Sequence, residues 1–358
     1  MIELFFCGDV FLANTTFNKR IGLGAKVSQL GKDKKIESLH SLAEKSDFVF
    51  CNLESPLTND GEIVKNSSFI GSSNIPQLLT NSCVNIISIA NNHILDHGVD
   101  KFEETIKILE RNGLSFVGKY ENGMSNICIF EKNNIKVGYA AFNGVDLHKI
   151  NNPDLFAELN EKTVKLTLEK MSSLEVDIKV LSFHWGDEYI TIPSPDQIKL
   201  GHFAIENGAN IIVGHHPHVV QPIECYKDGL IMYSLGNCIF DFLQSKQFRE
   251  GIVVKASINK LLKIEYKVIP ILLQETGYFS FRVKHNHNNF AFDELLDMYY
   301  KNEDKYSEYY YRRLKKNRFN ERIRMKIHLF KVLFTPIYRN KVIIFKNCIS
   351  TYLRVKQK

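Results

Sequence analysis

Residues 211–218 read Ile-Ile-Val-Gly-His-His-Pro-His, a short apolar run that passes directly into three histidines. A run of this length with β-branched residues is typical of a buried strand, so the histidines come where a strand ends. Four other predicted strands are followed by side chains that can bind a metal ion. These are Gly8-Asp9, Asn52-Leu53-Glu54, Asn91-Asn92-His93 and His184-Trp185-Gly186-Asp187-Glu188.

Short apolar runs alternate with helix-like segments from residue 2 to about residue 270. This alternation predicts an α/β layered fold, in which ligands bind beyond the carboxyl ends of the strands. Helical spacing is found in Lys101–Arg111, Glu158–Met171 and Pro195–Glu206. The predicted strands are Ile2–Cys7, Phe48–Cys51, Ile86–Ile89, Ile127–Phe130, Lys136–Phe142, Ile178–Phe183, Ile211–Val213, Leu230–Tyr233 and Ile252–Ala256.

The five polar clusters supply carboxylate, amide and imidazole groups and no thiolate. Divalent cations such as Mn²⁺, Fe²⁺, Zn²⁺ and Mg²⁺ are bound by sets of this kind. A single histidine after a strand is more often a packed or surface residue than a ligand. Five such clusters after five strands favour a metal site over that simpler interpretation.

The clusters, taken in order, resemble the CapA family, which is related to the calcineurin-like metallophosphoesterases. The resemblance covers roughly residues 2–257 and rests mainly on Asn52-Leu53-Glu54-Ser55-Pro56 and Gly214-His215-His216-Pro217-His218. It implies a metallophosphoesterase-type α/β/β/α sandwich over residues 1–285. Residues 286–358 would then form a basic helical C-terminal extension.

The resemblance also implies roles for individual residues and a cofactor of two divalent metal ions. His93 would assist the leaving group, and Glu188 is either an acid/base group or a structural carboxylate. Asn52 either hydrogen-bonds behind the ligands or shapes its turn, and Asp96 is interpreted as a turn residue. Asn237 either touches the site or, as the preferred interpretation, is a turn amide. The implied metal ligands are Asp9, Glu54, Asn92, His184 and, with no choice among the three, His215, His216 and His218.

These roles imply a metal-dependent hydrolase, a phosphoesterase by its ligand set, that acts in capsule or surface-polymer biosynthesis. Its substrate would be a phosphoester or, as a minor alternative, an amide in a γ-glutamyl polymer. One departure from the superfamily pattern makes catalysis less secure than metal binding. Asp9 is followed by Val10 and Phe11, where many superfamily members carry Asp-x-His and thus a further metal ligand. The alternative is a non-catalytic accessory that is stabilised by metal and docks a polymer synthase.

Composition favours an ordinary globular protein in a reducing compartment. Of the 358 residues 44% are hydrophobic, and the seven cysteines contain no Cys-x-x-Cys pair. No basic leader and no apolar run of about 20 residues is visible, so we expect a cytoplasmic protein without a spanning helix.

Basic residues are concentrated in the C-terminal segment. Residues 312–358 contain fifteen Lys and Arg and one acid, so the rest of the chain is net negative although the whole carries +6. Such a segment either docks on the inner membrane surface or a capsule-synthesis complex, or packs on the protein's own acidic face. A nucleic-acid partner is disfavoured, because no nucleic-acid-binding module accompanies the charge.

Overall fold

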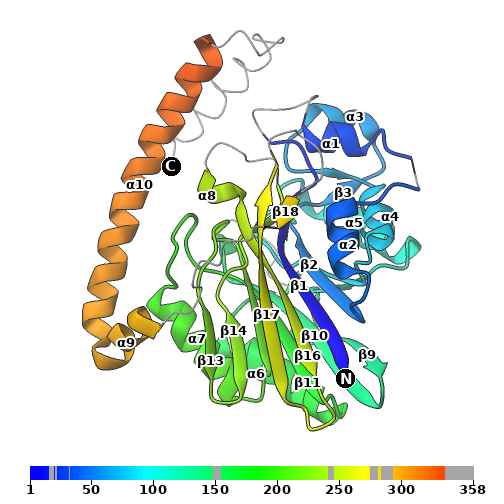
Figure 1. Cartoon of the computed structure of the whole chain (residues 1–358). Helices are drawn as coiled ribbons and strands as arrows, with labels where there is room; N and C mark the ends of the chain where they lie inside the picture. Colours follow the sequence, from blue (N-terminus) through cyan, green and yellow to red (C-terminus); the bar gives the residue numbers. More distant parts are fainter. Residues whose placement is uncertain are drawn as a thin grey trace.

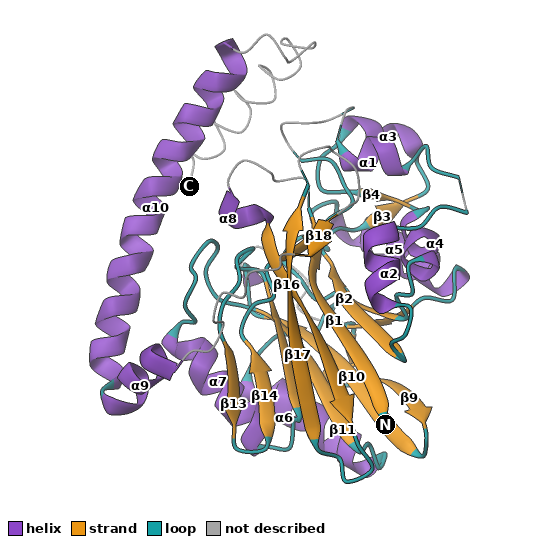
Figure 2. Ribbon diagram, viewed as in Figure 1, coloured by secondary structure: helices purple, strands orange, loops and turns teal. Residues whose placement is uncertain are grey.

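The computed structural model describes residues 1–15, 20, 22–31, 33–147, 155–240, 246–274, 281–283 and 293–334. Two sheets packed face to face form the centre of the molecule, with helices on their outer faces (Figure 1, Figure 2). This arrangement confirms the predicted α/β/β/α sandwich. The predicted C-terminal segment after Pro336 lies outside the described residues.

The first sheet is mixed, with β1 parallel to β2 and β15 and antiparallel to β16. Its strands in spatial order are β18 (Phe281–Val283), β17 (Ile264–Leu273), β16 (Glu250–Ile258), β1 (Ile2–Val10), β2 (Phe48–Leu53), β5 (Ile86–Ser88) and β6 (Ser115–Val117), and β15 (Asn237–Ile239) pairs separately with β1.

The second sheet has the parallel strands β10, β11, β12 and β14 at its centre. Its order is β13 (Ile223–Tyr226), β14 (Gly229–Met232), β12 (Ile211–His215), β11 (Ile178–His184), β10 (Ile135–Asn143) and β9 (Cys128–Lys132). Two small pairs complete the described strands: β3 (Leu57–Thr58) with β4 (Gly71–Ser72), and β7 (Tyr120–Glu121) with β8 (Met124–Ser125).

Alternation along the strands divides the core into layers. On β1, Leu4 and Phe6 face the second sheet, whereas Phe5 and Cys7 face the helices on the outside. The helices are α1 (Leu23–Val27), α2 (Glu37–Ala43), α3 (Gly61–Asn66), α4 (Ile75–Asn81), α5 (Gly98–Arg111), α6 (Glu161–Ser173), α7 (Pro195–Glu206), α8 (Lys246–Arg249), α9 (Asp293–Lys301) and α10 (Glu303–Phe334).

Every strand and helix that the sequence predicted between residues 2 and 270 is present, with ends that shift by up to three residues. The end of α5 follows the expected chemistry, since Asn112 caps it and Gly113 adopts a φ of +66°. β17 was not predicted, because Glu265, Tyr266 and Lys267 on it are exposed and give no apolar alternation.

α9 and the start of α10 lie beside α7 and the β13 edge of the second sheet (Figure 1). The hydroxyl of Tyr300 on α9 donates to the Glu224 carboxylate at 2.7 Å, and Tyr306 at the start of α10 is fully buried. The first part of the C-terminal extension therefore packs on the protein itself. Within the described ranges, none of the helices combines the length and the hydrophobicity needed to span a bilayer.

Candidate metal centre

Asp9, near the end of β1, is fully buried and accepts several hydrogen bonds. Asn52 Nδ2 donates to its Oδ1 at 2.9 Å, and His215 Nδ1 lies 3.1 Å from the same oxygen. The backbone N–H of His216 donates to Oδ2 at 3.3 Å. Although burial opposes ionisation, the interactions with His215 and His218 lower the pKa of Asp9 well below its usual range. Asp9 is therefore a buried carboxylate at neutral pH.

Glu54, which follows β2, differs from Asp9 because neither of its oxygens has a hydrogen-bond partner. Its side chain is fully buried, and burial raises its pKa to about 8. Three imidazole nitrogens surround Oε1: His218 Nε2 at 3.6 Å, and His93 Nε2 and His184 Nε2 at 3.9 Å each. A buried carboxyl group that lacks donors but faces several imidazoles is an arrangement that a cation would complete.

The turn after β12 places its histidines through strained backbone. His216 and His218 have φ values of +94° and +56°, in the left-handed region that residues with a side chain rarely adopt. Asn237 on β15 helps to hold this turn, because its Oδ1 lies 3.1 Å from His218 Nδ1 and its Nδ2 donates to the backbone of His218 and Phe248.

The buried histidines differ in their pKa values because their neighbours differ. Burial lowers the pKa of His216 to about 4, and burial together with His216 lowers that of His184 well below its usual range. His218 is also buried, but the Glu54 carboxyl and Asp9 raise its pKa to about 10. His184 and His216 are thus neutral imidazoles, the form that binds metals.

The described residues contain three groups whose potential ligand atoms lie within 4.8 Å of one another. The groups are Asp9, Glu54 and His218; Glu54, His184 and His216; and Glu188, His216 and His218. Buried nitrogens without a partner occur on His184, His215 and His216, in addition to the Glu54 oxygens. The donor set and these unpartnered atoms fit divalent cations, with Glu54 common to two of the groups.

Two further predicted ligands relate to these groups in different ways. The side-chain oxygen of Asn92 lies 2.9 Å from His184 Nε2, so the amide contacts a histidine of one of these groups directly. His215 is in none of the three groups and instead pairs with Asp9 through Nδ1. Of the three histidines that the sequence left open, His216 and His218 therefore belong to these potential ligand groups, whereas His215 contacts Asp9.

His93 lies at the edge of the cluster and is fixed by two neighbours. Its Nδ1 is 2.7 Å from Asp96 Oδ2, and its ring stacks on Phe69 with centroids 4.7 Å apart. Burial opposes protonation of His93, but Asp96 outweighs it and raises the pKa above its usual value. Asp96 therefore does more than the turn formation that the sequence analysis assigned to it. The position of Asp96 three residues after His93 was the sequence feature that could have indicated this contact.

Asn52, Asn91 and Asn237 connect the ligand-bearing segments. Asn52 hydrogen-bonds to Asp9, which settles the alternative that the sequence left open, and Asn91 Nδ2 donates to Leu53 O at 2.9 Å. Asn237 was interpreted as a turn amide but contacts His218 directly. Sequence alone could not show these contacts, since Asn237 pairs across 19 residues and Asn52 across 43.

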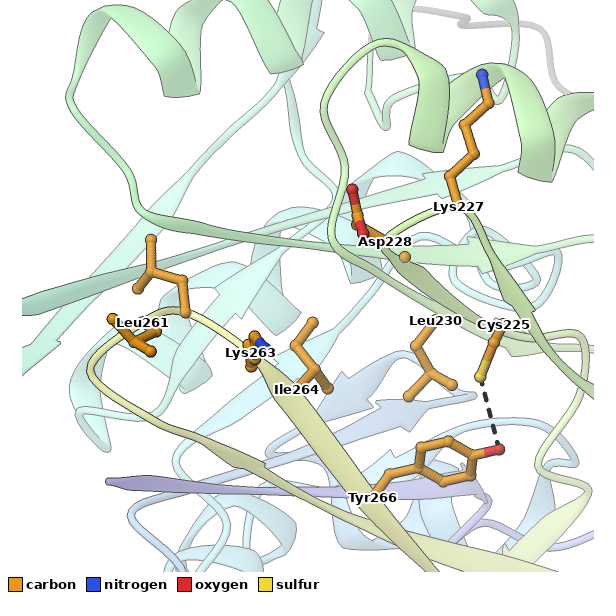
Figure 3. A pocket seen from close by; sticks show the side chains of 10 residues that line it. Cys225, Lys227, Asp228, Leu230, Leu261, Lys263, Ile264 and Tyr266 are labelled. Atoms are coloured by element: carbon orange, nitrogen blue, oxygen red, sulfur yellow. Dashed lines mark hydrogen bonds between the residues drawn. The ribbon is translucent and has the colours of Figure 1, made fainter.

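A separate pocket lies at the opposite ends of the strands, between the β13–β14 turn and the β16–β17 turn (Figure 3). Leu230, Ile264 and Tyr266 line it, and Lys227 and Asp228 stand at its rim. β14 begins beside Ile211, the first residue of β12, whereas the histidine turn follows the other end of β12. The pocket is therefore not part of the metal centre.

Comparison with known proteins agrees with the geometry of the site. The family model for "Bacterial capsule synthesis protein PGA_cap" matches residues 3–242, which include the five polar clusters. The capsule biosynthesis protein CapA of Bacillus anthracis is 31% identical over 233 residues, 60% of this chain and 56% of that protein. The PGA biosynthesis protein CapA of Bacillus subtilis (strain 168) is 29% identical over 257 residues, 69% of this chain and 67% of that protein.

The fold also has a counterpart among solved structures. A protein of Staphylococcus aureus, provisionally assigned as a 5'-nucleotidase and solved with alpha-ketoglutarate, superimposes with a TM-score of 0.50 and 16% identity. The match covers 77% of this chain and 55% of that protein, and at this identity it shows a shared fold. The chain therefore belongs to the bacterial capsule synthesis protein PGA_cap family, the CapA family.

Proposed function

We propose that this chain is a metal-dependent phosphoesterase that acts in the synthesis of a bacterial capsule or poly-γ-glutamate-type surface polymer. The observation that carries the proposal is the buried Glu54 carboxyl group, which has no hydrogen-bond donor and faces His93, His184 and His218. The polymer context comes from the family and from the names of the two Bacillus relatives.

Two cation positions that share Glu54 follow from the donor groups. Asp9, Glu54 and His218 would hold one cation, and Glu54, His184 and His216 would hold the other, with the amide oxygen of Asn92 beside it. Divalent cations held there would activate a water molecule for attack and neutralise negative charge on a phosphoryl group. Mn²⁺, Fe²⁺, Zn²⁺ and Mg²⁺ all fit a set of carboxylate, imidazole and amide ligands.

His93 is suited to transfer a proton to the departing oxygen of the substrate. Asp96 holds its Nδ1, so Nε2 faces the site 3.9 Å from Glu54 Oε1. Phe69 stacks on the ring and limits its rotation. A general acid placed in this way contributes about 10²–10⁴-fold to a rate.

The proposal is tested with the full-length chain, Mn²⁺ and a panel of aryl phosphomonoesters and phosphodiesters. His93→Ala should lower kcat by about 10²–10⁴-fold and keep cation binding, because His93 moves a proton. Asp9→Ala should lose both, since Asp9 belongs to a ligand group. His40→Ala is the matched control, because His40 on α2 pairs only with Glu44 in the described contacts and lies outside the cluster. Cation-loaded protein that hydrolyses no phosphoester would contradict the proposal.

A non-catalytic accessory function is the second candidate, and Phe11 favours it. Phe11 stands directly after β1, at the position where many superfamily members carry a histidine. Its ring is fully buried and stacks on Phe240 with centroids 4.8 Å apart, so Asp9 is the one residue of β1 in the ligand groups. Complementation of capsule synthesis distinguishes the candidates. His93→Ala should abolish the polymer if hydrolysis is the function, and should leave it unchanged if the protein acts as a scaffold.

A further inference from the structure

The helix α10 lies outside the region that matches the family, yet it contacts the segment that leads away from His184. This segment, residues 187–193, connects β11 to α7 and has no regular secondary structure. We call it the 187–193 loop. The hydroxyl of Tyr310 donates to Asp187 Oδ2 at 2.6 Å, and that of Tyr306 donates to the Pro193 carbonyl at 2.8 Å. Both ends of the loop are therefore attached to α10.

The middle of the loop is attached to the same face of the helix. Asn317 Nδ2 donates to the Tyr189 carbonyl at 3.1 Å, and Leu314 packs with Tyr310 on Ile190 and Ile192. Positions 306, 310, 314 and 317 are spaced by three or four residues, so they line one side of an α-helix. Ile190 and Ile192 are buried in this contact, each 3% exposed or less. The loop is thus packed against one continuous helical surface.

On its other side the loop borders the metal centre. A carboxylate oxygen of Glu188 lies within 4.8 Å of ligand atoms of His216 and His218. The N–H of Tyr189 donates to the Pro217 carbonyl, between those two histidines, at 2.8 Å. Tyr189 adopts a φ of +66°, which costs free energy unless neighbouring contacts stabilise it. The position of Glu188 therefore depends on contacts that the loop makes on both sides.

We propose that α10 positions the 187–193 loop so that Glu188 binds the same cation as His216, one of the two cations of the proposed function. Glu188 is then a ligand, whereas Tyr310 and Asn317 are positioning residues that act through the loop. The inference rests on the proposed metal centre but does not require hydrolysis. It gives the C-terminal helix a function in cation binding that the family match, which ends at residue 242, does not contain.

The experiment titrates the metal-free full-length chain with Mn²⁺ by calorimetry and by electron paramagnetic resonance. The double variant Tyr310→Phe/Asn317→Ala removes two hydrogen bonds to the loop and keeps the packing of Leu314. It should weaken the binding of one Mn²⁺ by about 10–100-fold, as loss of groups that orient ligands does. Glu188→Gln should weaken binding of the same ion. Adding Tyr310→Phe/Asn317→Ala to Glu188→Gln should cause little further loss, because the helix acts through Glu188.

The matched control is Tyr311→Phe/Asn320→Ala, which makes the same two changes on α10. Tyr311 is 57% exposed, and neither side chain has a hydrogen bond to the loop among the described contacts. Amide hydrogen exchange over residues 187–193 should quicken in Tyr310→Phe/Asn317→Ala and not in the control. Circular dichroism and the thermal midpoint establish that each variant is folded.

Three outcomes would overturn the inference. Unchanged Mn²⁺ affinity in Tyr310→Phe/Asn317→Ala would show that α10 does not position a ligand. If the loss of Mn²⁺ affinity caused by Tyr310→Phe/Asn317→Ala adds fully to the loss caused by Glu188→Gln, the helix does not act through Glu188 and the effect is one of general stability. A wild-type chain that binds no Mn²⁺ would overturn both this inference and the proposed function, whereas one that binds Mn²⁺ without hydrolysis overturns only the phosphoesterase activity.

Discussion

Two buried carboxyl groups in the same cluster differ because their neighbours differ. Asp9 interacts with His215 and His218, which outweigh burial and lower its pKa well below its usual range. Glu54 accepts no hydrogen bond, so burial raises its pKa to about 8. Both types of residue look alike in the sequence, as an acid after an apolar run. Only the hydrogen bonds distinguish an acid that is charged in the metal-free protein from one that is charged once a cation is bound.

Cation binding should therefore release protons and strengthen as the pH rises. At pH 7 the metal-free protein holds a proton on Glu54, because burial raises its pKa to about 8. A cation displaces this proton, so its affinity should rise by roughly tenfold per pH unit below pH 8. Calorimetry between pH 6 and 9 in buffers of different ionisation enthalpy measures both quantities. A cation affinity that does not change over this range would show that Glu54 does not lose a proton when the cation binds.

At the scale of elements, the ends of β1 and β12 approach neighbouring backbone without room for a side chain. A Cβ on Gly8 would lie 1.9 Å from the carbonyl oxygen of Gly236, and one on Gly214 would lie 1.9 Å from that of Tyr233. These glycines precede Asp9 and His215 directly. The absence of a side chain thus lets the ligand-bearing strand ends pack against the following segments.

Gly8→Ala should destabilise the protein by about 1–3 kcal/mol or more, because the strands must separate to admit the methyl group. Gly61→Ala at the start of α3 is the control, since a Cβ there meets nothing within 4 Å. Urea unfolding of the metal-free variants measures the difference. Equal midpoints for the two variants would show that β1 and β15 can move apart at little cost.

At the scale of the whole molecule, the centre is built from both sheets. Asp9 and Glu54 come from β1 and the end of β2 in the first sheet, whereas His184 and His215 end β11 and β12 in the second. The inter-sheet core, which includes Phe6, Phe50 and Tyr139, holds the two sets together. A cation that binds this centre therefore binds the packed sandwich and not either sheet alone.

Mn²⁺ should accordingly stabilise the whole fold, by about 2.7 kcal/mol at a free concentration of 100 times Kd. Removal of the cation with a chelator should lower the thermal midpoint. Glu54→Gln should lose this gain without lower metal-free stability at pH 7, because a neutral amide replaces a carboxyl that is already protonated there. A midpoint that does not respond to Mn²⁺ in the wild-type chain would contradict this expectation.

The sequence by itself determined most of the longer strands, the layered fold and the candidate ligands, because apolar runs and the polar residues after them are local properties. Asp9, Glu54, His184 and the histidines of residues 215–218 could be named for that reason. Tertiary structure decided which atoms meet. It paired His215 with Asp9, placed Asn237 against His218, and brought α10 onto the loop that carries Glu188. Contacts between residues more than a hundred positions apart depend on how two sheets and a distant helix pack, which no local pattern records.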